Sequence, residues 1–250
     1  MVERPYTLLS CGMSIDGYLD DATDERLLLS NDADFDRVDE VRAACDAILV
    51  GASTIRQDNP RLLIRSEARR AARIARGAAP DPVKVTVTGR GDLDPAASFF
   101  TTGAAEKIVY CAAPAVDGAR ELLGDRATVV DGGDPVDVRL VATDLAARGV
   151  RKLMVEGGGQ MHTQFLAAGI ADELHLVIAP FFIGDSRAPR FVHDGDFPWA
   201  PGNRAGLAEV RQIGDVVLLR YALSDRFENQ DRIENQAPER FDRQAATPPE

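Results

Sequence analysis

A carboxylate followed by three glycines, Glu156 to Gly159, is the stretch of this sequence best suited to chemistry. The apolar residues 153–155 before it predict a short buried strand, and the residues after Gln160 have a helical pattern. A glycine-rich turn between a strand and a helix lets a phosphate approach the backbone and the positive helix end. The glycines lack the G-x-G-x-x-G spacing of the dinucleotide fingerprint, so a plain tight turn remains an alternative. Glu156 favours a ligand site, because ligands bind at the carboxyl ends of strands in open α/β sheets.

A second candidate is a basic stretch at residues 65–76. The pattern predicts a helix over 66–76 that carries several arginines near one face, namely Arg65, Arg69, Arg73 and Arg76. Such a face is most simply a solvated helix surface. Contact with a phosphate is the sharper interpretation, because guanidinium groups bind phosphate bidentately.

The composition limits the class of protein. The formal charge of −11 over 250 residues argues against nucleic acid as the main partner, and 45% hydrophobic residues suffice for one large domain. The three cysteines form no C-x-x-C pair, so we expect no metal site and no disulfide framework. The sequence has no signal-peptide pattern and no apolar run of membrane-spanning length. We therefore expect a cytoplasmic protein with no membrane partner.

Apolar runs separated by turn residues predict alternating strands and helices. We expect strands over 6–13, 47–51, 83–88, 107–111, 127–130, 153–155 and 173–180. Helices are expected over 31–44, from 53 to the stop at 58–60, and over 66–76, 115–123, 138–148 and 160–168. This alternation predicts an α/β fold of three layers (α/β/α) with a mostly parallel sheet and a C-terminal antiparallel hairpin of 207–213 and 216–223. We assign residues 1–223 to this domain, and the polar residues 224–250 predict a disordered tail.

Several short motifs, in this order and spacing, resemble a known family. They are SIDG at 14–17, AILVG at 47–51 with Thr54, DNPRL at 58–62 with Arg65, VEGG at 155–158, and DEL at 172–174 with Ala179, Pro180 and Gly184. The chain from about residue 5 to 223 resembles the reductase domain of the bifunctional riboflavin-biosynthesis deaminase/reductase, which has a dihydrofolate-reductase-like fold. No deaminase signature, H-x-E followed by P-C-x-x-C, is present, so we expect a stand-alone reductase.

The resemblance implies an NADPH-dependent enzyme. It also implies two partners, a phosphorylated small molecule and a second copy of the chain in a homodimer. In the family, the ribosyl group of a ribosylaminopyrimidine 5′-phosphate is reduced to ribityl by hydride transfer to C1′ of an open-chain imine. Matching cofactor positions are Met13, Thr54, Asp58 and the turn Gly157, Gly158, Gly159, Gln160 and Met161. Matching substrate positions are Arg42, Leu62, Arg65 and Glu156.

The residues themselves are compatible with these roles but do not require them. Arg42 and Arg65 suit a phosphate, although without the resemblance a surface ion pair would be the simpler explanation of each. Thr54 could be a helix-cap residue and Asp58 a helix-stopping turn residue. Glu156 and Asp16 are our only candidates for a catalytic acid. The three histidines, His162, His175 and His193, are better explained structurally.

Two departures from the family leave other functions open. Ser10 stands where the family often has a lysine, and the leucines 27–29 replace a family tryptophan. One alternative is an NADPH-dependent reductase of a dihydropterin or dihydrofolate, or of another imine or carbonyl; Asp34 and Asp36 are the acids that could hold a pterin. A further alternative is a non-catalytic NADP(H)-binding protein.

Overall fold

The computed structural model describes residues 3–23 and 27–236. In this part of the chain nine strands form one sheet, in the order β5-β4-β3-β2-β6-β1-β7-β9-β8. The strands are β1 (Tyr6–Ser14), β2 (Ala47–Gly51), β3 (Val83–Thr88), β4 (Lys107–Cys111), β5 (Thr128–Asp131), β6 (Lys152–Val155), β7 (Glu173–Ala179), β8 (Gly206–Ile213) and β9 (Val216–Ala222). Strands β1 to β7 pair in parallel, whereas β9 is antiparallel to both β7 and β8. The mostly parallel sheet and its C-terminal hairpin are therefore confirmed.

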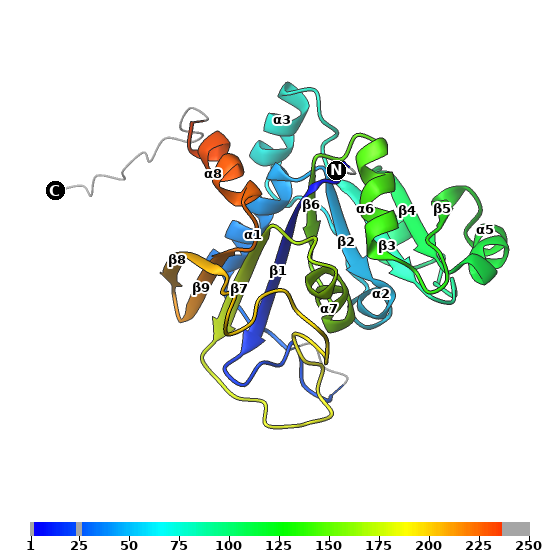
Figure 1. The fold of residues 1–250 in the computed structure, drawn as a ribbon. Helices are drawn as coiled ribbons and strands as arrows, with labels where there is room; N and C mark the ends of the chain where they lie inside the picture. The colour runs from blue at the N-terminus through cyan, green and yellow to red at the C-terminus, as the bar shows by residue number, and fades with distance from the viewer. Residues whose placement is uncertain (1–2, 24–26, 237–250) are drawn as a thin grey trace.

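Helices cover both faces of this sheet, which confirms the three layers. The helices are α1 (Asp32–Ala44), α2 (Ala52–Asp58), α3 (Glu67–Ala75), α4 (Ser98–Thr101), α5 (Val116–Leu123), α6 (Val138–Ala147), α7 (Gly159–Ala167) and α8 (Arg226–Gln236). Figure 1 shows α6 and α7 in front of the sheet, where they pack on one core cluster. Helices α1, α2, α4 and α5 pack on the cluster of the other face. Leu8 and Leu9 illustrate the alternation, since each belongs to a different cluster.

The topology brings three loops to one edge of the sheet. Strand β6 lies between β1 and β2, so the neighbouring parallel strands β2, β6 and β1 all end at the same edge. In open α/β sheets ligands bind at the carboxyl ends of strands where the strand order reverses. The stretch from Glu156 to Gly159 follows β6 and therefore lies at this edge.

The basic helix α3 is neither simply a solvated surface nor a phosphate site, because its arginines bind helix α1. Arg73 is buried and donates to the carbonyls of Ala43 and Cys45, at 2.9 and 2.6 Å, so it caps the end of α1. Arg69 pairs with Asp36 and Asp39 of α1. These arginines join α3 to α1, because the last carbonyls of a helix have no partner within it.

Part of the polar tail for which the sequence predicts disorder lies within the described residues and is helical. Residues 226–236 form helix α8, which Phe227 attaches by burying its ring. Arg226 donates to the buried carboxylate of Asp172 at 3.0 Å. The buried ring of Phe227 and the ion pairs Arg226–Asp172 and Asp231–Arg220 hold this helix. One buried aromatic residue is too sparse a pattern to predict an apolar helix face. Residues 237–250 lie outside the described residues, and the domain boundary at 223 stays a prediction.

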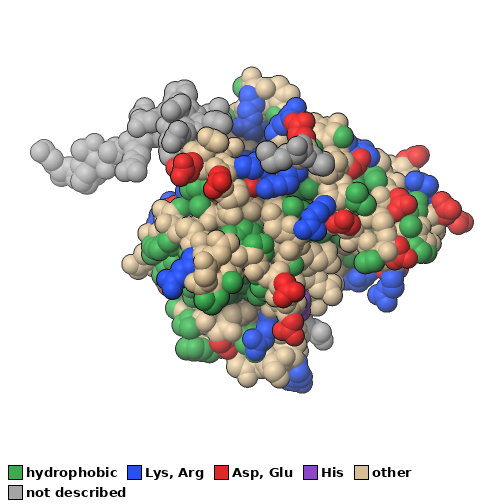
Figure 2. Space-filling view, in the orientation of Figure 1, with side chains coloured by type: hydrophobic (Ala, Val, Ile, Leu, Met, Phe, Trp, Pro, Cys, Tyr) green, Lys and Arg blue, Asp and Glu red, His purple; other side chains and the backbone are tan. Residues whose placement is uncertain are grey.

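Among the described residues, no helix combines the length and the apolar character needed to cross a bilayer. On the face drawn in Figure 2, acidic and basic side chains are interspersed rather than gathered by sign.

Candidate active site

Two adjoining pockets open at the sheet edge where β1, β2 and β6 end. The smaller pocket has a volume of about 500 Å³ and the larger one about 770 Å³. Both are lined by the same residues where they meet, namely Thr54, Gln57, Gly158, Gly159 and Pro189. Ligands in the two pockets would therefore touch each other at the glycine turn and the start of α2.

The glycine turn is packed so closely that side chains are excluded. A Cβ atom on Gly159, the first residue of α7, would lie 2.2 Å from the backbone oxygen of Arg190. A Cβ atom on Gly51, at the end of β2, would lie 3.2 Å from the side chain of Met161. The Gly157–Gly158 peptide bond is cis. The first N–H groups of a helix have no partner within it, so the start of α7 offers the smaller pocket hydrogen-bond donors and a positive dipole end.

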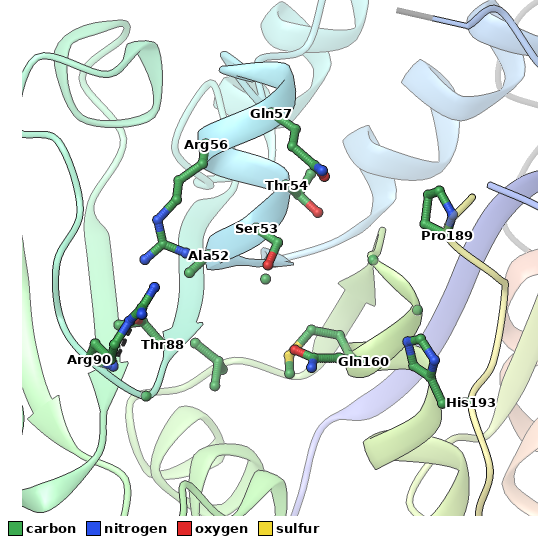
Figure 3. Close-up of a pocket in the computed structure, with 16 residues that line it drawn as sticks. Ala52, Ser53, Thr54, Arg56, Gln57, Thr88, Arg90, Gln160, Pro189 and His193 are labelled. Atoms are coloured by element: carbon green, nitrogen blue, oxygen red, sulfur yellow. Dashed lines mark hydrogen bonds between the residues drawn. The ribbon is translucent and has the colours of Figure 1, made fainter. Parts of the chain in front are cut away.

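Side chains from three elements complete the smaller pocket (Figure 3). Ser53 and Thr54 project from α2, and Gln160 from α7, while His193 comes from the long loop after β7. At the opposite end from His193, the side chains of Arg56 and Arg90 lie side by side. Asp92 pairs with both of them, which leaves this end of the pocket with a net positive charge. The smaller pocket thus combines a helix N-terminus with a cationic end, as a phosphorylated nucleotide requires.

The larger pocket holds an arginine–carboxylate pair at its centre. Arg42, in the last turn of α1, donates to both oxygens of Glu156, with Nε–Oε1 at 2.6 Å and Nη2–Oε2 at 2.5 Å. Burial lowers the pKa of Arg42, but the charge of Glu156 and its hydrogen bonds raise it more, so the net shift is upward. The pair fixes the position of both groups, because a bidentate contact constrains distance and plane together.

A buried polar network supports the larger pocket from below. Arg37 donates from Nε to Asp34 at 2.6 Å, and its Nη1 lies 3.3 Å from His175 Nδ1. His175 Nε2 in turn lies 2.7 Å from Glu173 Oε1. Burial lowers the pKa of His175, so this ring is neutral near pH 7. Ser10 pairs in register with His175, so this buried network lies beside the position where the family often has a lysine.

The structure brings most of the predicted site residues together. Six of them line the larger pocket only, namely Arg42, Asp58, Leu62, Arg65, Glu156 and Gly157, and Thr54 lines both pockets. Gly158 and Gly159 line both pockets, whereas Gln160 and Met161 line the smaller one. Met13 lines neither pocket and is packed against the core cluster beneath α7. The individual roles of these residues stay predictions.

Asp16 lies outside both pockets. Its carboxylate accepts hydrogen bonds from the Ser14 hydroxyl at 2.6 Å and from the backbone N–H groups of Ile183 and Gly184, at 3.1 and 2.8 Å. These contacts, with the Ser14 bond strongest, lower the pKa of Asp16 to about 2. Asp16 therefore ties the turn after β1 to the loop after β7, and the geometry gives no support to its predicted catalytic role.

Several pocket residues escaped the sequence prediction. Arg90 follows β3 directly, so the rule that parallel strands end at one edge could have found it. Arg56 is one turn beyond the start of α2 and carries no local signal. His193 comes from a long irregular loop and lines the smaller pocket, in contrast to its purely structural interpretation. His162 does have a structural place, since it is fully buried beside Phe191.

The chain is similar to proteins of known sequence and structure. The RibD C-terminal domain family matches residues 5–219. A 2,5-diamino-6-ribosylamino-4(3H)-pyrimidinone 5′-phosphate reductase of Archaeoglobus fulgidus is 32% identical over 77% of this chain and 88% of its own length. The protein of the same name from Methanothermobacter thermautotrophicus is 29% identical over 88% of this chain and 99% of its own length.

The fold is that of solved proteins of this kind. A pyrimidine reductase-like protein of Corynebacterium diphtheriae superimposes with a TM-score of 0.73 at 23% identity, covering 87% of this chain and 91% of that one. This likeness confirms the predicted dihydrofolate-reductase-like fold. Because the family match spans most of the chain and the fold agrees with it, the protein belongs to the RibD C-terminal domain family.

Proposed function

We propose that this protein is an NADPH-dependent reductase that converts the ribosyl group of a ribosylaminopyrimidine 5′-phosphate to ribityl, in riboflavin biosynthesis. The observation that carries the proposal is the pair of pockets that meet at Gly158 and Gly159. A hydride transfer needs two ligands in direct contact, held in a defined orientation and shielded from water. The names of the relatives from Archaeoglobus fulgidus and Methanothermobacter thermautotrophicus support the same substrate class.

The residues of the smaller pocket fit a phosphorylated dinucleotide. The glycines remove side chains where a diphosphate would approach the start of α7. Arg56 and Arg90 share one acidic partner, Asp92, so a guanidinium charge remains for a further phosphate. That charge favours NADPH over NADH, because the extra 2′-phosphate needs a cationic partner. When bound, the reduced nicotinamide would supply a hydride.

The residues of the larger pocket fit a phosphorylated aminopyrimidine. Glu156, oriented by Arg42, presents a carboxylate that can accept hydrogen bonds from pyrimidine N–H and amino groups. Arg65 lines the same pocket from the segment after α2, and its largely exposed side chain is accessible to a phosphate. The chain thus holds the ring at Glu156 and the phosphate at the pocket rim, and the sugar would lie between them.

The reaction requires little further chemistry from the protein. The open-chain imine gains a hydride at C1′ and a proton at nitrogen, and the product is the ribitylamine. Apolar side chains from residues 27–29 line the larger pocket and exclude water from the imine. Glu156 remains our candidate for the group that orients the substrate or delivers this proton.

The arrangement of α1 disfavours the dihydropterin alternative. Asp34 lines the larger pocket, but its carboxylate is occupied by Arg37 at 2.6 Å and Ser30 at 2.6 Å. Asp36 pairs with Arg69 of α3 instead. A pterin would need a helix carboxylate free to accept two hydrogen bonds, and these two acids are already paired.

A direct assay tests the proposal. Purified protein is mixed with NADPH and either the deaminated or the undeaminated ribosylaminopyrimidine 5′-phosphate, and the loss of reduced-nicotinamide absorbance is followed. We expect oxidation of NADPH with one of the two substrates and none with dihydrofolate. Turnover of dihydrofolate alone would replace the proposed substrate, and NADPH binding without any turnover would favour a non-catalytic protein.

We also propose a homodimer that forms through β8. This strand is at the edge of the sheet and exposes Leu207 and Val210 to solvent. Figure 2 shows hydrophobic side chains near this end of the sheet. An exposed edge strand with apolar side chains pairs readily with a second chain. Light scattering should give a dimer for the wild type and a monomer for Val210→Glu; a dimer in both would place the interface elsewhere.

A further inference from the structure

In the described part of the chain four arginines line the larger pocket, and they differ in how far their charges are already neutralised. The four are Arg37, Arg42, Arg61 and Arg65. Arg42 is paired with Glu156 and Arg37 with Asp34. Arg65 donates to the backbone oxygen of Phe35 at 2.6 Å, and its Nε lies 4.0 Å from Asp39. The charges of Arg37 and Arg42 are thus neutralised by ion pairs, and that of Arg65 is partly neutralised.

Arg61 is the exception. In the described part of the chain, its side chain has no hydrogen bond and no ion pair, although it lines a pocket that also contains acidic residues. Its guanidinium is exposed at the rim rather than folded onto a neighbour. Arg61 is thus unpaired among the described residues, and Arg65 is only partly neutralised. A phosphate dianion is the ligand that best matches two such guanidinium groups.

The backbone around Arg61 is fixed before any ligand binds. Asn59 and Leu62 are the two non-glycine residues with positive φ in the described chain, at 43° and 48°. The Asn59 side chain accepts a hydrogen bond from the backbone N–H of Ser98 at 2.6 Å, and Leu62 is buried in the core. Non-glycine residues in this conformation are held there by their surroundings and are common at ligand sites. A fixed backbone reduces the entropy lost when Arg61 binds a ligand.

Arg61 and Arg65 are close enough to share one ligand. Leu62 and Ile64 are buried between them, whereas Arg61 and Arg65 are exposed toward the pocket. Four residues of extended chain span at most roughly 14 Å, and two arginine side chains can close that distance around a phosphate.

We propose that Arg61 is a phosphate-binding residue and, with Arg65, forms the clamp that makes the enzyme specific for a 5′-phosphorylated substrate. This inference rests on the proposed function, because it assigns the phosphate of that substrate to the rim of the larger pocket. Glu156 and Arg42 would then contact the ring. Arg61 and Arg65 at the rim would alone distinguish the phosphorylated substrate from its dephosphorylated form.

The test compares two substrates in one variant. KM is measured for Arg61→Gln with the 5′-phosphorylated ribosylaminopyrimidine and with its dephosphorylated riboside. We expect KM for the phosphorylated substrate to rise roughly tenfold or more, since a charge-assisted hydrogen bond is lost. KM for the riboside and kcat for both should stay near the wild-type values. Equal changes with both substrates, or none, would overturn the assignment.

Arg126→Gln is the matched control, because it removes the same charge from an exposed residue outside both pockets. It should leave both KM values unchanged; a selective rise in the phosphate KM here too would mean that net charge, rather than Arg61, is responsible.

A binding measurement separates this inference from the proposed function. Calorimetry with ribose 5-phosphate needs no turnover, so it can be performed even if neither pyrimidine is reduced. Binding by the wild type that is lost in Arg61→Gln would support the phosphate clamp while the reductase proposal fails. Equal binding by both proteins would overturn the clamp whatever the reaction.

Discussion

The two pockets lie side by side, yet they are built in different ways. The smaller one is formed by backbone: glycines at the end of β2 and the start of α7, and a loop carbonyl that leaves no room for a Cβ atom. The larger one is formed by paired side chains, with Arg42 against Glu156 and Arg37 against Asp34. The backbone of the smaller pocket suits recognition of a ligand by its shape. The side chains of the larger pocket suit recognition of a particular pattern of hydrogen-bond donors and acceptors.

This difference predicts how each pocket responds to mutation. A pocket made from backbone is sensitive to added volume. A pocket made from ion pairs is sensitive to removal of one partner, because the other is left as an uncompensated charge. Substitutions in one pocket should therefore leave the other ligand largely unaffected.

The largest effect is expected for Glu156→Gln. Loss of the carboxylate leaves Arg42 unpaired in a half-buried site, so kcat/KM for the pyrimidine should fall roughly hundredfold or more. The dissociation constant of NADPH, measured by fluorescence titration, should change little. Glu121→Gln, an exposed substitution on α5, is the control. Equal loss of substrate use and NADPH binding would mean that Glu156 shapes the glycine turn that both ligands share.

Gly159→Ala should have the next largest effect, on the cofactor. The new Cβ would lie 2.2 Å from the carbonyl oxygen of Arg190, so the loop after β7 must move away from α7. We expect NADPH affinity to fall roughly tenfold, as for a strained backbone contact. Gly118→Ala is the matched control, because a Cβ there meets nothing within 4 Å. Unchanged NADPH affinity in Gly159→Ala would exclude this turn from the cofactor site.

Arg90→Gln should separate the two nicotinamide cofactors. If Arg90 contacts the 2′-phosphate, its loss should raise the dissociation constant of NADPH by about tenfold and leave that of NADH unchanged. Titrations with both cofactors measure the ratio directly. A similar loss of affinity for NADPH and NADH would mean that Arg90 contacts the diphosphate, which both cofactors share, rather than the 2′-phosphate.

The last prediction concerns the stability of the fold rather than ligand binding or turnover. His162 lies beneath the glycine turn, where burial lowers its pKa from 6.5 to about 4. Between these values the unfolded chain binds a proton that the folded protein does not, so stability falls as pH decreases through this window. The total loss is roughly 3 kcal/mol.

Urea unfolding of His162→Leu between pH 7 and pH 4 measures this contribution. The variant should lose less stability than the wild type as the pH falls, although His175, whose pKa burial also lowers, keeps part of the slope in both proteins. Parallel pH profiles for the two proteins would mean that His162 does not resist protonation.

Some structural features depend only on neighbouring residues and could be predicted, whereas others depend on contacts between distant parts of the chain. The strand–glycine–helix unit at 153–168 was predictable, because hydrophobic periodicity and glycine turns depend on neighbouring residues. The helix α8 was not, because Arg226 stabilises it through a contact with Asp172, 54 positions earlier in the chain. Arg69 and Arg73 likewise needed the position of α1 before their role was apparent.

The residues of the candidate site also fall into two groups, those that the sequence indicated and those that only the structure revealed. Glu156 and the glycines were recognised from their place after a strand, and Arg42, Arg65 and Leu62 from the spacing of motifs that resemble a family. Arg37, Arg61 and His193 carry no such signal, since nothing in their neighbouring residues says that they line a pocket.

The sequence by itself determined the order of strands and helices, the three layers and the edge at which ligands bind. These follow from periodicity, turn residues and the constraint that parallel strands end together. Only the tertiary structure decided which charges are paired and which remain available. Ion pairs such as Arg42–Glu156 join residues that are 114 positions apart, and their existence depends on distances that the chain sets only after it has folded.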